Sequence, residues 1–332
     1  AEHHAKIRAQ GNRVERQCHG VHTHQAHLRV DEREDRQDDK VHRRGDHALQ
    51  SHERRGDAVH YPLGAQRGVR KVVLAEDVRI IGRGIIAHPL RGIEITYSKD
   101  VLVDGVTVLN PQHYTVYGGQ SENITIRNLK SFSARPWSDG IDLMCCRHVK
   151  IHNVFLRNSD DCIALYNHRW WYWGGSSDFD ISRATLWCDW AHPVNIGTHG
   201  DDRSETGETL ENVRIHDCDI LFHVGDGMLT IGCGDKNTIR DVTYDSIRIE
   251  EVPKARLFEM RVDYSEKYNR APGNRVENVR FRNISVTAPE GNINPSLIID
   301  YDKQRSVGGY TLENVTVNGR PFRPETDVVR TM

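Results

Sequence analysis

The sequence lacks the features that mark several classes of protein. Its net charge is −2 over 332 residues, so it shows no basic excess of the kind that indicates a nucleic-acid partner. No apolar run approaches the roughly 20 residues that a membrane-spanning helix needs. The chain also has no phosphate-binding loop, redox-cofactor motif or metal signature. We therefore expect no nucleic-acid or membrane partner, no metal and no cofactor, while the oligomeric state is not indicated.

Two further absences concern the cellular compartment. The seven cysteines are an odd number without Cys-x-x-Cys spacing. This pattern fits reduced, mostly buried thiols better than a disulfide framework or a zinc site. No secretory signal is visible at the start, although a cleaved signal would leave no trace. A cytoplasmic and a secreted location are both compatible with the sequence.

The first sixty residues contain no Phe, Tyr or Trp and are rich in His, Arg, Asp and Gln. Such a segment cannot bury enough apolar surface to offset the loss of chain entropy on folding. We therefore divide the chain into residues 1–70, expected to be disordered or non-native in sequence, and a domain of residues 71–332. The alternative for the first segment is a metal-binding or interaction arm built on its histidines.

From residue 78 onward a short apolar pattern recurs nine times. Each unit has an apolar marker, an apolar residue two positions later, and mostly Gly, Asn or Asp four positions after the marker. The alternation indicates strands, and Gly or Asn at the fourth position predicts a corner because these residues tolerate positive φ. The markers are Val78, Val101, Ile124, Val149, Phe179, Val213, Val242, Val279 and Val315.

A repeated unit of two short strands and a corner predicts an all-β fold, a parallel β-helix or solenoid. Each coil of such a fold stacks on the next at about 4.8 Å, and the inward positions form continuous apolar stacks. A leucine-rich repeat would need a leucine-dominated consensus, which is absent. A β-sandwich would not keep one register through nine units.

Polar side chains follow the second strand of four consecutive units. Asp139 stands in one unit, Asp160 and Asp161 in the next, His192 in the third and Asp226 in the fourth. Stacked coils would bring these residues to one face, about one strand spacing apart. Carboxylates this close should separate their pKa values and leave one group protonated near neutral pH, as an acid–base pair requires.

The ordered set of motifs resembles that of the polygalacturonase-type glycoside hydrolases, a group related to the dextranases. The matching segments are SDGID at 138–142, the aspartate pair, and HPVNIG at 192–197, and the similarity extends over residues 75–320. That family has a right-handed parallel β-helix and inverts the anomeric configuration by single displacement. The resemblance implies a glycoside hydrolase that acts on a polysaccharide or oligosaccharide, with residues 71–332 as the catalytic domain.

The resemblance also implies roles for four catalytic side chains. Asp160 matches the general acid of the family. Asp139 and Asp161 match the carboxylates that hold and activate the attacking water. His192 matches the histidine that supports the ionisation of the acid and binds substrate nearby.

Further side chains are predicted to contact the substrate. Asp142 matches a supporting acid of the first motif, and Asp226 is expected on the same face. The segment NHRWWYWGGSS follows the aspartate pair after five intervening residues. Its tryptophan rings are expected to lie against sugar faces, and they belong to Trp170, Trp171 and Trp173. The alternative for this segment is a lid that packs on the side of the β-helix, or a partner interface. Trp187 and Trp190 either extend the same surface or pack within the fold.

Three departures from the family pattern bear on the substrate. Trp137 and Ser138 replace the usual Asn-Thr, so one polar contact to substrate is lost, and His192 lacks its flanking glycines. In GDGMLTIG, Leu229 and Ile231 stand where pectin-cleaving members carry Arg and Lys. Those cations grip a galacturonate carboxylate. We therefore expect a neutral glycan or glycoside rather than polygalacturonate.

Two other functions fit the same fold. One is a β-helix polysaccharide lyase whose acids bind calcium, and the other is a non-catalytic carbohydrate-binding β-helix. The register of Asp139, Asp160 and Asp161 favours hydrolysis over the lyase. The identity of the sugar, the linkage and the choice between endo and exo action are not indicated.

Overall fold

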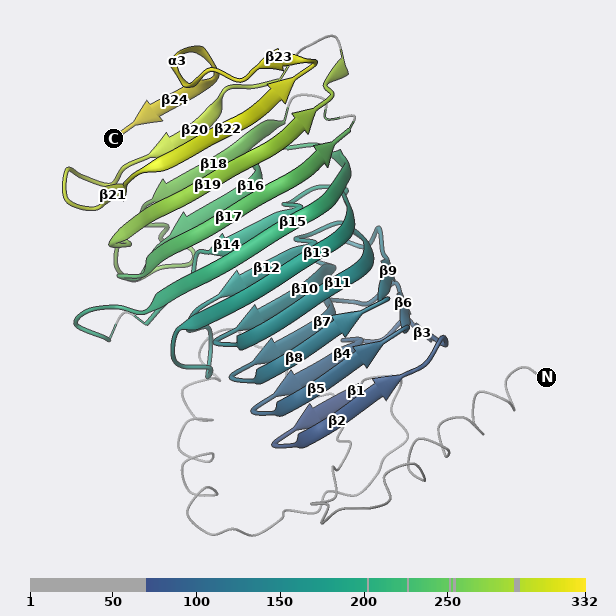
Figure 1. Cartoon of the computed structure of the whole chain (residues 1–332). Helices are drawn as coiled ribbons and strands as arrows, with labels where there is room; N and C mark the ends of the chain where they lie inside the picture. Colours follow the sequence, from purple (N-terminus) through teal and green to yellow (C-terminus); the bar gives the residue numbers. More distant parts are fainter. Residues whose placement is uncertain (1–69, 202, 226, 251, 253–254, 290–292) are drawn as a thin grey trace.

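The computed structural model describes residues 70–201, 203–225, 227–250, 252, 255–289 and 293–332. The prediction for residues 1–70 therefore falls, apart from Arg70, outside the described residues. Figure 1 shows the described chain as a stack of coils that runs from the N-terminal to the C-terminal end. The predicted all-β parallel β-helix is confirmed.

Two long sheets run the length of the stack, and their strands pair in parallel except for the last pair of sheet B, β22 and β23 (Figure 1). Sheet A consists of β1 (Arg70–Val73), β4 (Ile93–Thr96), β7 (Tyr114–Gly119), β10 (Asp139–Met144), β12 (Ile163–Tyr166), β14 (Val194–Gly197), β16 (Gly227–Cys233), β18 (Arg256–Val262), β20 (Ser296–Ile299) and β24 (Val328–Thr331). The main path of sheet B consists of β2 (Glu76–Ile81), β5 (Lys99–Asp104), β8 (Glu122–Arg127), β11 (Arg147–Asn158), β13 (Ser176–Cys188), β15 (Thr209–His223), β17 (Thr238–Ile249), β19 (Arg275–Val286), β22 (Tyr310–Val317) and β23 (Arg320–Pro321).

The remaining elements are short. Three short strands continue the first coils beyond their corners, namely β3 (Ile85–Ala87), β6 (Thr107–Leu109) and β9 (Lys130–Phe132). They join sheet B where β9 pairs with β11. Near the C-terminus, β21 (Ser306–Val307) pairs with β19, and α3 (Pro324–Asp327) precedes the last strand. From β11 to β19 the sheet B strands are long because each runs through its corner without a break.

The predicted corner at the fourth position after the marker has a left-handed backbone in eight of the nine units, whereas Gly82 in the first unit does not have a positive φ. Gly105, Asn128 and Asn153 have φ of 84°, 54° and 55° there, in the left-handed region. Arg183 and Ser246 occupy the same position with φ of 49° and 55°, so the geometry is imposed even where the residue does not favour it. A second left-handed position, which we did not predict, directly precedes the markers, with φ between 52° and 62° at Asp77, Asp100, Asn123, His148, Asp178, Asn212, Asp241, Asn278 and Asn314.

The core lies between the two sheets and consists of stacked apolar side chains. One stack along sheet A is fully buried and aligned by strand pairing, and it comprises Ile141, Ile163, Val194, Leu229 and Phe258. Along sheet B, buried and exposed side chains alternate, as in a sheet with one face exposed to solvent. The sheet A strands from β4 to β16 are buried almost throughout. The outer face of sheet A is therefore covered or recessed, and the predicted site lies at its edge.

Six of the seven cysteines lie in the described part of the chain, where they are free and buried. The expected burial of the thiols is confirmed for these six. Among the described residues, none of the helices has the length and apolar character needed to cross a membrane.

Candidate active site

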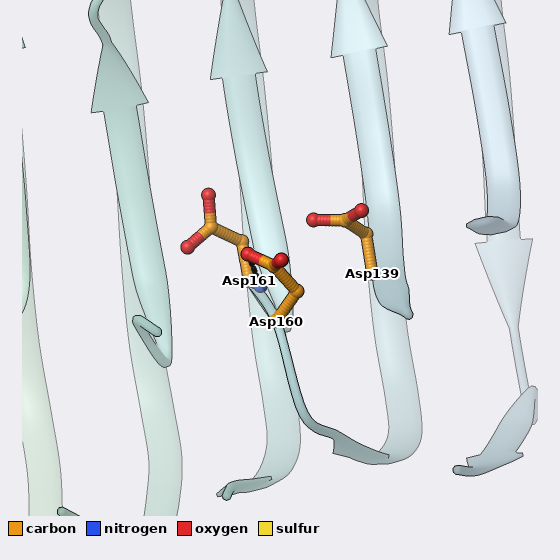
Figure 2. Close-up of side chains that lie close together, drawn as sticks. All are labelled: Asp139, Asp160 and Asp161. Carbon is orange, nitrogen blue, oxygen red and sulfur yellow. Dashed lines mark hydrogen bonds between the residues drawn. The ribbon is translucent and has the colours of Figure 1, made fainter. Parts of the chain in front are cut away.

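The starts of neighbouring sheet A strands bring three carboxyl groups together. Asp139 begins β10, and Asp160 and Asp161 precede β12 on the next coil with one residue in between. Gly140 N–H donates to the Asp161 carbonyl at 2.8 Å, which fixes the two strand starts side by side. Figure 2 shows the Asp139 carboxyl pointing from its strand toward the aspartate pair on the neighbouring one. Each of the three carboxyl groups has an oxygen within 4.8 Å of the others.

The third predicted coil adds His192, which precedes β14. Its Nδ1 lies 2.7 Å from Oδ1 of Asp161. The other oxygen of Asp161 accepts hydrogen bonds from Asn195 at 2.7 Å and from the Tyr166 hydroxyl at 3.2 Å. Asp161 is buried, so these partners replace the water that would otherwise solvate its charge. Asn195 and Tyr166 were not among the predicted site residues.

The environment gives Asp161 and His192 opposite and complementary charges. Burial works against the charge of Asp161, but His192 and the two hydrogen-bond donors outweigh it and lower the pKa of this carboxyl. Burial likewise disfavours the imidazolium, and the Asp161 carboxylate outweighs it and raises the pKa of His192. The two pKa shifts favour an anionic Asp161 beside a protonated histidine.

The other two carboxyl groups are shifted in the opposite direction. Burial, followed by the charges of the neighbouring carboxylates, raises the pKa of Asp139 well above its usual range. Burial, followed by the charge of Asp161, also raises the pKa of Asp160. Arg169 opposes both shifts from nearby. The cluster therefore separates into one firm anion and two groups that hold a proton more readily, as expected for close carboxylates.

Asp142 lies under Arg169 and does not face open solvent. Its side chain is only 1% exposed, and Arg169 Nη1 lies 3.6 Å from its Oδ2. Burial raises the pKa of Asp142, and the guanidinium opposes that shift. The guanidinium also lies 4.2 Å from the ring centroid of Trp170. The predicted contact of Asp142 with substrate stays a prediction, and Arg169 is a cation of this site that the sequence analysis missed.

The aromatic segment folds back over the outer face of sheet A. Trp170 stacks on the fully buried Tyr117 of β7 with ring centroids 5.8 Å apart, and Trp171 packs on the same cluster. Trp173 stacks on His168 at 3.4 Å. These contacts fit the alternative of a lid packed on the β-helix. All three rings are partly exposed, so their predicted contact with sugar stays a prediction.

The structure corrects the placement of Leu229 and Ile231. We expected both on the substrate face in place of Arg and Lys, but both point into the core and are 0% exposed. The alternation along β16 differs by one residue from our reading, because a shift of one position turns every side chain to the other face. Thr230 therefore stands on the outer face, in register with Asn195. Neither the predicted nor the observed orientation places a cation on the outer face of β16, because the strand contains no Lys or Arg.

The next strand, β18, supplies cations near the site. Arg256 Nη1 and Arg261 Nε each lie 3.2 Å from the carboxylate of Glu259. Glu259 is in register with Thr230, which is itself in register with Asn195, and the charges of Arg261 and Glu259 both act on the pKa of His192. Asp226, the remaining predicted site residue, lies outside the described residues.

The chain is similar to one protein family over most of its length. The family model for glycosyl hydrolases family 28 matches residues 88–330. A polygalacturonase of Chamaecyparis obtusa is 32% identical over 114 residues, which are 34% of this chain and 20% of that protein. A probable endopolygalacturonase D of Neosartorya fischeri is 20% identical over 248 residues, 73% of this chain and 46% of that protein. The chain thus spans less than half the length of these relatives.

A solved structure shows the same fold. The family 28 exopolygalacturonase of Yersinia enterocolitica superposes with a TM-score of 0.54 over 72% of this chain and 45% of that one. The sequence identity is 15%, so this likeness concerns the β-helix alone.

Proposed function

Because the chain belongs to the glycosyl hydrolases family 28, we propose that it hydrolyses a glycosidic bond of a polysaccharide or oligosaccharide. The family match confirms the predicted polygalacturonase-type class of glycoside hydrolase. One observation carries the proposal to this chain: Asp139, Asp160 and Asp161 meet within 4.8 Å, and their environments drive their pKa values apart. Hydrolysis of a glycoside needs both a proton donor and a proton acceptor at one bond.

Asp160 is suited to be the general acid. Its pKa is raised, and unlike Asp161 it is partly exposed, so a leaving oxygen can reach its proton. The proton passes to the glycosidic oxygen as the bond between that oxygen and the anomeric carbon breaks. Asp161, held as an anion, accepts a proton from the water whose oxygen bonds to the anomeric carbon. One product thereby receives the hydroxyl group of the water and the other receives a proton. Asp160 is protonated again before the next cycle.

Asp139 completes the site from the neighbouring strand. Its raised pKa makes it a group that shares the available proton with Asp160 in the free enzyme. A protonated Asp139 can donate a hydrogen bond to the water while Asp161 accepts from it. Our proposal thus places water activation mainly on Asp161 and water positioning on Asp139.

Inversion of the anomeric configuration is part of the proposal and rests on the family. The common inverting arrangement separates two carboxyl groups by roughly 6.5–9.5 Å to leave room for water. The 4.8 Å limit between the closest oxygens here is shorter. We place the water between the carboxyl groups of Asp139 and Asp161, beside the acid Asp160, so that three carboxyl groups and not two define its position. Proton NMR of the first anomer released tests this step, and a retained configuration would contradict it.

The activity itself is tested by the release of reducing ends from a panel of neutral and acidic glycans. We expect the intact chain to release them, and the Asp160→Asn variant to lose at least two orders of magnitude in kcat, since general acid catalysis contributes roughly 10²–10⁴-fold. Asp219→Asn is a matched control, because this carboxylate lies on sheet B and pairs with Arg248. Equal activity in the folded Asp160→Asn variant would refute the role of the acid.

A calcium-dependent polysaccharide lyase is the second candidate, because three carboxyl groups within 4.8 Å could hold a cation. Against it, the charge of Asp161 is already compensated by His192, whose Nδ1 lies 2.7 Å from the carboxylate. A lyase would leave an unsaturated product that absorbs ultraviolet light, and it would lose activity with a chelator. Hydrolysis predicts neither result.

A further inference from the structure

Two tryptophan side chains stand out from the surface beside the acid cluster. Trp137 is 67% exposed and Trp190 is 76% exposed, whereas the other four tryptophans are partly buried. Trp137 precedes Asp139 by two residues, and Trp190 precedes His192 by two residues. A large exposed indole is costly to leave in water, and two of them beside one site indicate a surface that binds something.

Backbone hydrogen bonds place the two tryptophan residues in one column of the β-helix. Asp160 N–H donates to the Ser138 carbonyl at 3.2 Å, and Ala191 N–H donates to the Ser159 carbonyl at 3.2 Å. Trp137, Ser159 and Trp190 therefore occupy neighbouring positions on three successive coils. Two coil steps correspond to roughly 10 Å. The coil between them contributes the small Ser159, directly followed by Asp160.

We propose that Trp137 and Trp190 are substrate-binding residues that stack on sugar rings on opposite sides of the bond that Asp160 protonates. This inference rests on the proposed glycoside hydrolysis. The Trp137/Trp190 pair brackets the coil of the acid, so a glycan that presents its glycosidic oxygen to Asp160 extends past one indole in each direction. Indoles bury apolar sugar faces with little loss of side-chain freedom.

The pair differs from the aromatic segment in what its rings already touch. Trp170 stacks on Tyr117 and Trp173 stacks on His168, so those rings are engaged by the fold. At Trp137, stacking of a sugar ring on the indole takes the place of the polar contact that Asn-Thr makes in related motifs. Stacking does not depend on the charge of the sugar, so the inference holds for neutral and acidic glycans alike.

The test measures binding in a variant that cannot turn the ligand over. In the full-length chain carrying Asp160→Asn, Trp137→Ala and Trp190→Ala are introduced singly and together, with Tyr301→Ala as the exposed-aromatic control. The probe is a partial hydrolysate of pectin, which contains acidic main-chain and neutral side-chain oligosaccharides, titrated by calorimetry. We expect each tryptophan variant to bind roughly three- to tenfold more weakly, the double variant to lose more, and Tyr301→Ala to bind as the parent does.

Three results would overturn the inference. They are unchanged affinity in both tryptophan variants, no binding of the probe by the parent, and a change of oligomeric state by sedimentation in place of a change in affinity, which would make the pair a contact between copies of the chain. In the otherwise wild-type chain, KM should rise more than kcat falls, since stacking is mostly uniform binding. Intact binding by the pair without any hydrolysis by the wild-type chain would refute the proposed function and leave the inference standing.

Discussion

Replacing His192 by Gln should weaken the fold in a pH-dependent way. The exchange keeps a polar side chain but removes the positive charge that lies 2.7 Å from Asp161. Asn195 and Tyr166 still donate to the carboxylate, so we expect a loss of about 2 kcal/mol, less than the roughly 3–5 kcal/mol of a buried pair that loses all its partners. At pH 6 this corresponds to a Tm lower by roughly 4–8 °C.

The sign of the pH dependence follows from the two shifts. The pKa of His192 is raised, so its contribution is complete below the ordinary value of 6.5 and is lost as the pH rises through its raised value. The pKa of Asp161 is lowered, so its contribution is complete above the ordinary value of 3.8 and is lost as the pH falls through its lowered value. The difference in stability between wild type and His192→Gln should therefore be largest between about pH 4 and pH 6.5.

The assay is thermal unfolding of both proteins from pH 4 to pH 9, with His148→Gln as the control. His148 pairs with Asp178 at 3.3 Å on the exposed sheet B, where an ion pair contributes about 0–1 kcal/mol. In the same variant the acid limb of the kcat/KM profile should move to higher pH, because Asp161 loses its cation. A stability difference that stays constant from pH 5 to pH 9 would refute the charged pair.

Three further predictions concern metal, packing and substrate charge. Treatment with EDTA should leave hydrolysis unchanged, and a complete loss restored by calcium would favour the lyase. Trp170→Ala should lower the free energy of unfolding by about 2 kcal/mol, because the ring packs between Tyr117 and Arg169; a raised KM with unchanged stability would instead place this ring on the sugar. The value of kcat/KM should be higher for neutral glycans than for polygalacturonate, because Arg169, Arg256 and Arg261 are each already paired with a carboxylate. A preference for polygalacturonate that Arg261→Gln abolishes would contradict this and place the counter-charge on β18.

The repeat could be predicted because the same constraint acts on every coil. An apolar residue two positions after the marker and a corner two positions later recur, and the corner is visible wherever Gly or Asn fills it. The second left-handed position, such as Asp77 or Asn123, also had a signal, since Asp, Asn or His precedes every marker. We did not predict it because the prediction used only the spacing of apolar residues, and the residue before each marker is polar.

The acid cluster could be predicted in part. Asp139, Asp160, Asp161 and His192 follow strands of successive coils, and their order in the sequence carries over to adjacent positions in space. The direction of side chains along β16 could not be read reliably, because Leu229, Thr230 and Ile231 are all compatible with a buried face. Arg169 was missed because it stands in an insertion without a repeat, whose path depends on tertiary packing.

The central claim is that Asp160 donates the proton in a hydrolytic reaction that depends on the anionic Asp161. The most direct measurement is kcat for wild type, Asp160→Asn and Asp161→Asn on the glycan that releases the most reducing ends, with folding confirmed by thermal unfolding. The account predicts a loss of at least about 100-fold in each variant and partial recovery in Asp160→Asn for an activated aryl glycoside, whose leaving group needs less protonation. Wild-type rates in either folded variant would contradict the account.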